Sequence, residues 1–418
     1  MDKPMKLGVI GAGGMRGLTW ISTVKKLSDQ FELVGIAEVS EQRRKDAAAR
    51  FQTPTFATPE EMLQKTQPTM ALAAVPPDGN HAFVEICARH KVHVMTEIPI
   101  APTRRIAQYA IDAAKAAGIK YDITENVHQW PNERLKQKIV ASGLIGTPQI
   151  VHLTYTSGGY HGFNAIRGII SLDRKAKRAL GATGWAKIPF YEDYMQRQLT
   201  EQYWARGVIE FDGGVTCFYY MPPLGHETTH WEIECSGGEI VGTQLRVGKN
   251  EKTNYDFQHE WTAMKVEPPG YHGGILPNHK YGLQCGDRVL DHVRAETPKP
   301  IVWTNPYKQY GIGIPNDLDE IARAQMLLDH RAAILEDTPA RYGPQNAWTD
   351  QELVVAVHES ARRGTWVDLP LTEDTSVERD QHEAFKSVYG CAWDDIPGLM
   401  KAKLISGGRV RWEVLRDL

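Results

Sequence analysis

The chain has 418 residues, of which 42% are hydrophobic and 24% charged, which is typical of a globular protein with about two domains. Its formal net charge of −3 gives no sign of a nucleic-acid or membrane partner, and no apolar run is long enough to span a bilayer. The five cysteines are scattered and never in CxxC spacing, which indicates reduced thiols in a cytoplasmic protein. The first predicted strand begins at residue 6, so we expect no signal peptide.

A glycine-rich turn follows the first predicted strand. Leu7–Ile10 is a short apolar run typical of a buried strand, and a segment with helical spacing follows the glycines. In dinucleotide sites the first glycine allows a tight turn, the second lets backbone approach a pyrophosphate, and the helix N-terminus offers free N–H groups to the anion. The usual third glycine is Arg16 here. The turn therefore predicts dinucleotide binding by Gly11, Gly13, Gly14, Met15 and Arg16.

The second predicted strand ends in an acidic residue. Phe31–Ala37 is followed by Glu38, roughly 20 residues beyond the turn, where a carboxylate binds the ribose diol of a dinucleotide. The negative charge of Glu38 repels a 2′-phosphate and favours NAD. Arg43 and Arg44 follow closely and leave NADP open, so Arg43 is also a candidate cofactor contact.

Residues 5–127 alternate between strand and helix patterns, which indicates a parallel sheet covered on both faces. Ligands of such sheets lie at the carboxyl ends of the strands, so the loops that follow the later strands should border one crevice. These loops contain further candidates: Pro76, Asn80 and His81 after the fourth strand, Glu97 and Pro99 after the fifth, and Glu125, Asn126, His128 and Trp130 after the sixth.

The chain changes character after residue 149. The segment VHLTYT alternates, and hairpins are predicted around Asp212–Gly214 and around Gly237 and Gly238, which indicates a mainly antiparallel sheet with one open face. Helices are expected from near His161, over 317–335 and over 349–363, whereas residues 250–315 have no clear pattern. The fold class is therefore α/β, with a Rossmann domain over 1–127, an α+β substrate and oligomerisation domain over 128–371, and an extension over 372–418.

With these residues in place, roughly residues 5–371 resemble the Gfo/Idh/MocA family of NAD(P)-dependent oxidoreductases. The resemblance rests on the glycine turn, Glu38, the PPxxxH loop, the tripeptide Glu97-Ile98-Pro99 and the ending YGPQNAWTDQELVVAVHESARRGTWVDLPL. It implies an N-terminal Rossmann domain, a C-terminal domain with an open antiparallel sheet, activity on sugars or related alcohols, and assembly into homo-oligomers. It also implies that Glu97 orients the nicotinamide ribose or carboxamide.

Two positions depart from the dehydrogenases of that family, which carry Glu-Lys-Pro and Asp-x-x-x-His. Ile98 stands at the lysine position and Ser157 at the aspartate position, while His161 keeps the histidine. In these segments, including Glu125-Asn126 and Tyr160-His161-Gly162, the chain resembles the NAD-dependent glycosidases of the family. NAD-dependent sulfoquinovosidases are another redox-assisted class to consider. The alternative explanation of the two departures is loss of activity by sequence drift.

Resemblance to the glycosidases implies a cycle of transient oxidation at C3, loss of the C2 proton and the C1 substituent, water addition and re-reduction. Such a cycle needs groups that move protons at O3, at C2 and at the leaving oxygen. His161 is the first candidate, because the ordinary pKa of histidine lies near neutrality. Tyr160 and Glu125 are the other catalytic candidates, with packing and a structural ion pair as their alternatives.

Several residues are candidates for substrate contact beside His128 and Trp130. Arg167 and Lys187 would suit an anionic substrate, since a guanidinium binds carboxylate or sulfonate bidentately. Tyr194 would offer a ring to a sugar, although a core or interface position is the alternative for each. His230, Glu232 and Glu234 share one face of a predicted strand, but a polar strand face explains their spacing and we predict no metal.

The sequence thus predicts an NAD-dependent enzyme of small-molecule sugars or glycosides, without nucleic-acid or membrane partners. Glycoside hydrolysis is the first reading. A sugar or polyol dehydrogenase with net hydride transfer is the alternative, and a non-catalytic NAD-binding regulator is the third.

Overall fold

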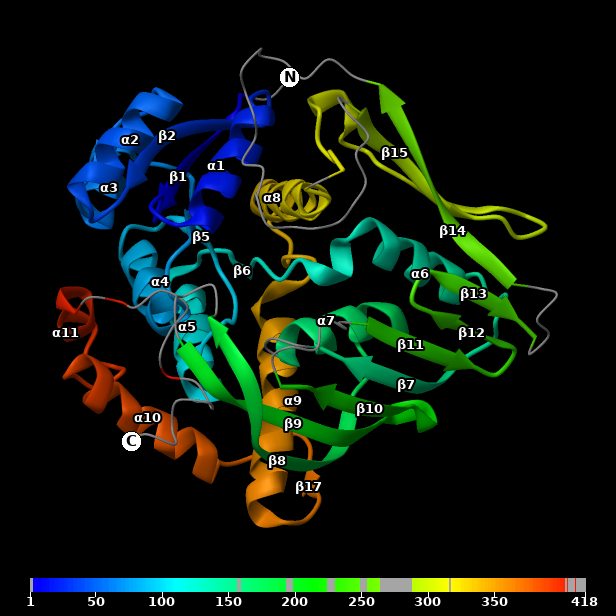
Figure 1. Ribbon diagram of the computed structural model, residues 1–418. Helices are drawn as coiled ribbons and strands as arrows, with labels where there is room; N and C mark the ends of the chain where they lie inside the picture. The colour runs from blue at the N-terminus through cyan, green and yellow to red at the C-terminus, as the bar shows by residue number, and fades with distance from the viewer. Residues whose placement is uncertain are drawn as a thin grey trace.

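The computed structural model describes residues 3–155, 159–192, 198–223, 230–248, 254–263, 288–315, 317–402, 404 and 410. Two sheets organise this part of the chain, one in the first third and one in the remainder (Figure 1).

The first sheet has six parallel strands in the order β3-β2-β1-β4-β5-β6. This confirms the predicted Rossmann-type fold. Because β1 lies between β2 and β4, the strand order reverses there, and the crevice for a ligand opens at the carboxyl ends of β1 and β4. The strands are β1 (Met5–Ile10), β2 (Phe31–Ala37), β3 (Thr55–Phe56), β4 (Met70–Ala73), β5 (His93–Thr96) and β6 (Tyr121–Ile123).

Helices connect these strands and cover both faces of the sheet (Figure 1). Three of them begin with a side-chain cap, because Ser40, Thr58 and Thr103 each accept a hydrogen bond from the backbone N–H three residues on. These caps fix where each crossover leaves its loop. The helices are α1 (Met15–Lys26), α2 (Glu41–Phe51), α3 (Pro59–Thr66), α4 (Asn80–Arg89) and α5 (Arg104–Ala117).

The second sheet has eleven strands in the order β16-β15-β14-β13-β12-β11-β7-β10-β9-β8-β17. Neighbours are antiparallel except β7 and β10, which run parallel. The hairpins predicted around Gly213 and Gly237 are present as β9–β10 and β11–β12. The strands are β7 (Pro148–Thr154), β8 (Ala176–Glu192), β9 (Gln198–Phe211), β10 (Thr216–Met221), β11 (His230–Cys235), β12 (Gly238–Val241), β13 (Gln244–Val247), β14 (Asn254–Ala263), β15 (Arg288–Ala295), β16 (Ile301–Thr304) and β17 (Val367–Asp368).

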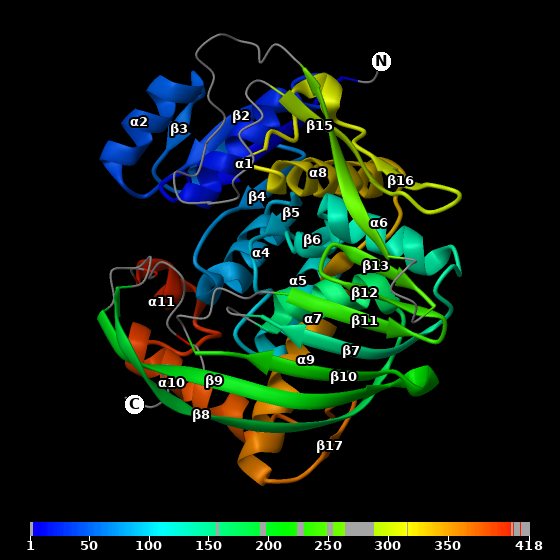
Figure 2. The same ribbon diagram turned by 45° about the vertical axis from the view of Figure 1, so that its right-hand side comes forward.

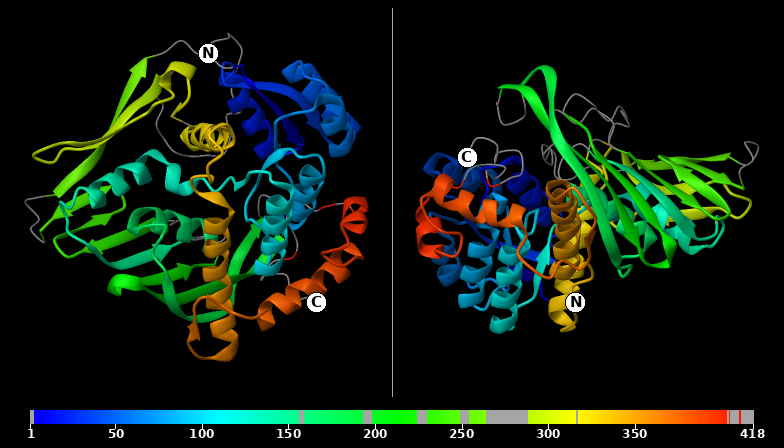
Figure 3. Two further views of the ribbon diagram at one scale, coloured as in Figure 1. Left: turned by 180° about the vertical axis from the view of Figure 1, so that it is seen from behind. Right: turned by 90° about the horizontal axis from the view of Figure 1, so that it is seen from below.

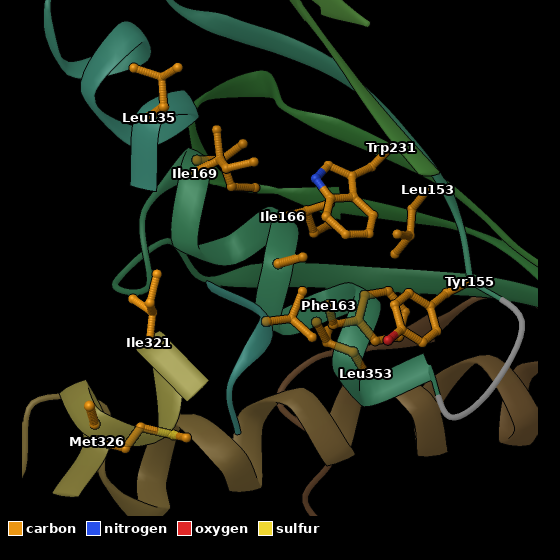
Figure 4. Packing of buried hydrophobic residues seen from close by; sticks show 14 of the residues in the cluster. Leu135, Leu153, Tyr155, Phe163, Ile166, Ile169, Trp231, Ile321, Met326 and Leu353 are labelled. Carbon is orange, nitrogen blue, oxygen red and sulfur yellow. The ribbon is translucent and has the colours of Figure 1, made fainter. Parts of the chain in front are cut away.

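Helices cover one face of this sheet, as Figures 2 and 3 show. In α7 the apolar residues Phe163, Ile166 and Ile169 recur every third position, so they form one stripe that packs toward Trp231 and Leu353 (Figure 4). This packing sets the position of the first turn of α7. The helices are α6 (Pro131–Ala141), α7 (Gly159–Ile170), α8 (Asp319–Leu335) and α9 (Gly343–Arg363), and short 3₁₀ turns occur at Pro77–Gly79, Val127–Gln129, Asp212–Gly214 and Lys308–Tyr310.

The chain returns to the Rossmann domain after β17. Helices α10 (Ser376–Tyr389) and α11 (Ile396–Lys401) lie beside α4 and α5, in red in Figures 1 and 3. Thr375 and Glu378 form a capping box that starts α10. None of the helices in the described part of the chain combines the length and apolarity needed to cross a membrane.

Candidate active site

The glycine turn joins β1 to α1 and is closely packed. Gly11 has a φ of +88°, which side chains with a Cβ rarely adopt. A Cβ at Gly17 would lie 2.0 Å from the carbonyl oxygen of Gly11. Gly17 therefore supplies the close helix–strand packing expected from position 16, and the motif is shifted by one residue rather than incomplete. No side chain caps the N-terminus of α1 at Gly14, so its backbone N–H groups suit a pyrophosphate.

Glu38 lies at the edge of this turn, as the sequence predicts. Its carboxylate accepts hydrogen bonds from the backbone N–H of Ala12 at 3.1 Å and of Ser40 at 3.0 Å, and the residue is buried. A Cβ at Gly13 would lie 2.6 Å from a Glu38 oxygen and 2.4 Å from Cδ of Arg43, so both side chains border the turn. A carboxylate in this place fits the ribose diol of NAD. Arg44 donates to the carbonyls of Glu38 and Val39 instead.

Arg16 connects the turn to the second domain. Its guanidinium lies 3.1 Å from Glu97 and 2.9 Å from Asp319 at the start of α8. Burial alone would raise the pKa of the Asp319 carboxyl, but Arg16 and Arg323 hold it well below its usual range. Trp20 also donates to Glu97. Glu97 thus lies at the crevice with two donors already bound to its carboxylate.

Asn80 and His81 have different surroundings although they are adjacent in sequence. The Asn80 amide donates to the carbonyls of Glu97 and of Pro99, and so joins the loop after β4 to the loop after β5. The His81 ring is fully buried, and its Nε2 lies 2.7 Å from the carbonyl oxygen of Trp393. This contact places His81 under the C-terminal extension rather than at the cofactor crevice where we expected it. Pro76 begins the 3₁₀ turn of the same loop.

Glu125 and His161 form a hydrogen-bonded pair where β6 ends. The Nδ1 atom of His161 lies 2.7 Å from a carboxylate oxygen of Glu125, which also accepts from the backbone N–H of Asn126 at 3.1 Å. An ionised carboxylate can only accept, so Nδ1 carries the proton and Nε2 is left as an acceptor. Tyr155 and Tyr160 flank the imidazole, with ring centroids 5.6 and 4.6 Å away. The structure therefore brings together the three residues predicted to be catalytic.

A small pocket adjoins this pair, and Ile98 forms part of its wall together with Glu125 and Tyr160. Asp350 of α9 also lines it, and burial raises the pKa of the Asp350 carboxyl to about 6 although Arg167 opposes this. No lysine lines this pocket in the described part of the chain. The complete lining is Ile98, Pro99, Ile100, Ile123, Glu125, Tyr160, Tyr342, Ala347, Asp350 and Gln351.

The residues after Glu125 have structural partners. His128 is buried, its Nδ1 lies 3.0 Å from the side-chain oxygen of Asn164, and burial lowers its pKa to about 3. The surroundings of His128 are therefore those of a core residue rather than those of the substrate contact that we expected. The indole of Trp130 donates to Asp319 at 3.0 Å, and the amide of Asn126 donates to the same carboxylate.

Arg167, Lys187 and Tyr194 do not gather at the pocket. Arg167 is 1% exposed, and its guanidinium is bound by Asp350 and by the backbone of Leu172, so it is a core residue rather than the anion-binding group that we expected. Lys187 is exposed on β8, opposite Glu201, and does not line the pocket. Tyr194 and Ser157 lie outside the described residues.

Sequence reasoning missed the residues that come to the site from far along the chain. Asp319 lies 303 residues from Arg16, and Tyr342 and Asp350 reach the pocket from the end of the second domain. The acidic start of the predicted helix at Asp317 was the available signal for Asp319. Among the described residues, no group of three His, Cys, Asp or Glu side chains is placed to hold a metal ion.

The fold and the site define an α/β protein with a dinucleotide-binding Rossmann domain and a second domain that contacts its glycine turn through Asp319. Residues 5–124 match the GFO/IDH/MocA family, described as an oxidoreductase family with an NAD-binding Rossmann fold. The N-terminal domain is therefore an NAD-binding Rossmann domain similar to those of that family. No curated protein matches the chain significantly.

Solved structures show the same overall fold at low sequence identity. A levoglucosan dehydrogenase in complex with NADH and levoglucosan aligns with a TM-score of 0.64 and 16% identity, covering 88% of this chain and 100% of its own. The WlbA dehydrogenase from Bordetella pertussis, in complex with NADH and UDP-GlcNAcA, aligns with a TM-score of 0.62 and 14% identity, covering 89% and 99%. An oxidoreductase from Agrobacterium radiobacter, in complex with NAD⁺, L-tartaric acid and magnesium, aligns with a TM-score of 0.62 and 14% identity. The alignment covers 87% of this chain and 98% of the oxidoreductase.

Proposed function

We propose that this chain is a cytoplasmic NAD-dependent enzyme that hydrolyses glycosides by transient oxidation of the sugar. The observation that carries the proposal is the Glu125–His161 pair, held at 2.7 Å beside a pocket wall in which Ile98 replaces the lysine of the dehydrogenases. An acid/base pair is present, but the ammonium group that serves net alcohol oxidation in the resembled family is absent from that wall.

A sugar substrate is supported by the solved structures. The levoglucosan dehydrogenase and the WlbA dehydrogenase share this fold and were solved with a sugar and a nucleotide sugar, respectively. The site of this chain also offers Tyr160 and Tyr155 around His161, and aromatic rings suit the apolar faces of a sugar.

The proposed roles follow from the atoms that are available. Bound NAD supplies a hydride acceptor, and later a hydride donor, for C3 of the sugar. Nε2 of His161 takes the proton from O3 while Glu125 holds the imidazole through Nδ1. The resulting ketone acidifies the C2 proton, which passes to a second base, the Tyr160 oxygen as phenolate, because His161 still holds the O3 proton. The C1–O bond then breaks with a proton given to the leaving oxygen.

Water restores the sugar in the second half of the cycle. Its oxygen bonds to C1, one of its protons is taken by the base, and C2 regains a proton. Reduction of the C3 ketone, with a proton returned to O3 by His161, completes a hydrolysis in which no net redox change occurs. Gly11, Gly13, Gly14, Glu38 and Glu97 would hold the dinucleotide during the cycle.

A sugar or polyol dehydrogenase is the second candidate function. It is favoured by the solved relatives that are dehydrogenases, and the Glu125–His161 pair could accept the alcohol proton without a lysine. A regulator that binds NAD without turnover is the third.

Assembly into homo-oligomers is also proposed, supported by Phe218 and Tyr220, which are 44% and 41% exposed on β10.

The test uses the purified protein without added cofactor. Bound NAD is released by denaturation and assayed, and the native protein is then offered neutral and anionic aryl glycosides. Aglycone release without a rise in NADH absorbance supports the hydrolase and identifies the sugar. A steady NADH rise with free sugars and added NAD⁺, without aglycone release, supports the dehydrogenase instead. NAD binding with neither reaction leaves the regulator.

A further inference from the structure

The segment after Leu371 packs against the loop that follows β4. The carboxylate of Asp78 in this loop accepts a hydrogen bond from the Tyr389 hydroxyl at 2.6 Å and from the backbone N–H of Val410 at 3.3 Å. Asp78 is 1% exposed, so these donors compensate a charge that lies away from water. A Cβ at Gly79 would lie 2.5 Å from Leu404, which shows how closely the segment packs here.

The same segment is built onto the start of α5, which follows the β5 loop. Arg104 is paired with Glu378 at 2.7 Å, and its backbone N–H also donates to that carboxylate at 2.8 Å. Glu378 is fully buried. One residue earlier, the hydroxyl of Thr103 lies 2.8 Å from Nε2 of His382. Buried, charged hydrogen bonds of this kind are among the stronger contacts in proteins.

These two attachment points are linked to each other through the loops that follow β4 and β5. The amide of Asn80, next to Gly79, donates to the carbonyls of Glu97 and Pro99 in the β5 loop. Both loops leave the carboxyl ends of central strands, where a dinucleotide binds in this fold. A dinucleotide that leaves a closed crevice requires such loops to move, so contacts that hold the loops slow its release.

We propose that the described residues from 372 to 402, with Leu404 and Val410, form a C-terminal clamp that fixes the β4 and β5 loops and thereby retains NAD through many turnovers. The solved structures that share this fold are covered over 98 to 100% of their own length, while about an eighth of this chain is unmatched. Retention suits a reaction that returns the cofactor to its starting oxidation state. The inference rests on the proposed function, because a dehydrogenase with net hydride transfer must release NADH in every turnover, whereas the release rate itself is measured without a sugar.

The experiment measures how fast NADH leaves the full-length protein. NADH-loaded protein is mixed with a large excess of NAD⁺, and the loss of energy transfer from tryptophan to bound NADH is followed in time. The variants are Tyr389→Phe and Glu378→Gln. The control is Asp380→Asn, because Asp380 lies on the same helix but pairs with Arg362 at an exposed site.

We expect each of the two clamp variants to release NADH about tenfold faster, because the free energy of one hydrogen bond to a charged group corresponds to about this factor. The control should release NADH at the wild-type rate. The unfolding midpoint of each NAD-free variant is measured in parallel. The proposal is overturned if Tyr389→Phe releases NADH at the wild-type rate, if the control accelerates release equally, or if the wild type exchanges NADH within one turnover. Should Glu378→Gln fail to fold, Tyr389→Phe decides, since it keeps the ring and loses only the hydroxyl.

Discussion

Replacing Glu125 by Gln tests the catalytic pair most directly. The glutamine has the same shape, and its side-chain oxygen can still accept from the backbone N–H of Asn126, so the loop should keep its conformation. The change acts on His161. The glutamine oxygen also still accepts from Nδ1, but the negative charge that stabilises the imidazolium after Nε2 takes the sugar proton is lost.

The expected loss follows from the geometry. The two side chains are 3% and 16% exposed and lie 2.7 Å apart, so the carboxylate acts on the imidazolium with little screening. Opposite charges about 4 Å apart attract by about 4 kcal/mol at an effective dielectric constant of about 20. If the transition state experiences most of this attraction, the rate falls by on the order of 10³, at about 1.4 kcal/mol for each factor of ten.

The assay is aglycone release, or NADH formation if the enzyme is a dehydrogenase, as a function of pH for wild type and variant. Glu234→Gln is a matched control. It removes a carboxylate that lies 2.9 Å from Nε2 of His152, but on the exposed face of the second sheet. A kcat for Glu125→Gln within threefold of wild type, with an unchanged pH profile, would refute the assignment of the pair.

Three further predictions concern other parts of the site. Ile98→Lys should bring an ammonium group to Glu125 in the pocket, and net NADH formation from free sugar and NAD⁺ should rise; unchanged redox balance would contradict it. Gly17→Ala should cost about 1–3 kcal/mol in unfolding free energy and weaken NADH binding, because its Cβ would meet the Gly11 carbonyl; Gly14→Ala, with open space around it, is the stability control in urea titrations. Burial lowers the pKa of His81 to about 4, so the folded state binds fewer protons than the unfolded state, and the stability that His81 contributes is present above pH 6.5 and lost as the pH falls toward 4. That loss should be on the order of 3 kcal/mol and absent from His81→Gln, which urea unfolding at pH 7.5 and 4.5 would reveal.

The Rossmann domain could be predicted nearly element by element, because each of its strands is a short apolar run and several helices begin with a capping residue. The second sheet was harder. Its longest strand, Ala176–Glu192, carries lysines, glycines and a proline on a sheet with one open face, so neither alternation nor apolar content indicates it. Residues 254–304 contain three strands of the sheet edge where the sequence has no clear pattern.

The site could be predicted where it depends on local loops and not where it depends on tertiary contacts. Glu125 was a candidate because it follows a predicted strand and His161 because it begins a predicted helix, and the structure places the two side chains 2.7 Å apart. Arg167 was a plausible anion-binding residue by type alone, but its position about two turns along an apolar helix directs it into the core against Asp350. His81 shows the same limit, because nothing within the Rossmann domain indicates that the extension covers it.

The contacts of Arg16 explain why the shifted glycine motif matters for the whole site. Gly17 packs against β1 in place of residue 16, which frees the Arg16 side chain to reach Glu97 and Asp319. Asp319 in turn accepts hydrogen bonds from Trp130 and Asn126. Asn126 follows Glu125, whose carboxylate is hydrogen-bonded to His161. Substitution of Arg16 by glycine would leave the buried carboxylate of Glu97 without this cation, and the second domain would lose its charged contact with the turn, although Asp319 would keep Arg323. The one-residue shift thus connects the cofactor turn to the catalytic loop through a continuous set of hydrogen bonds, which a glycine at position 16 cannot provide.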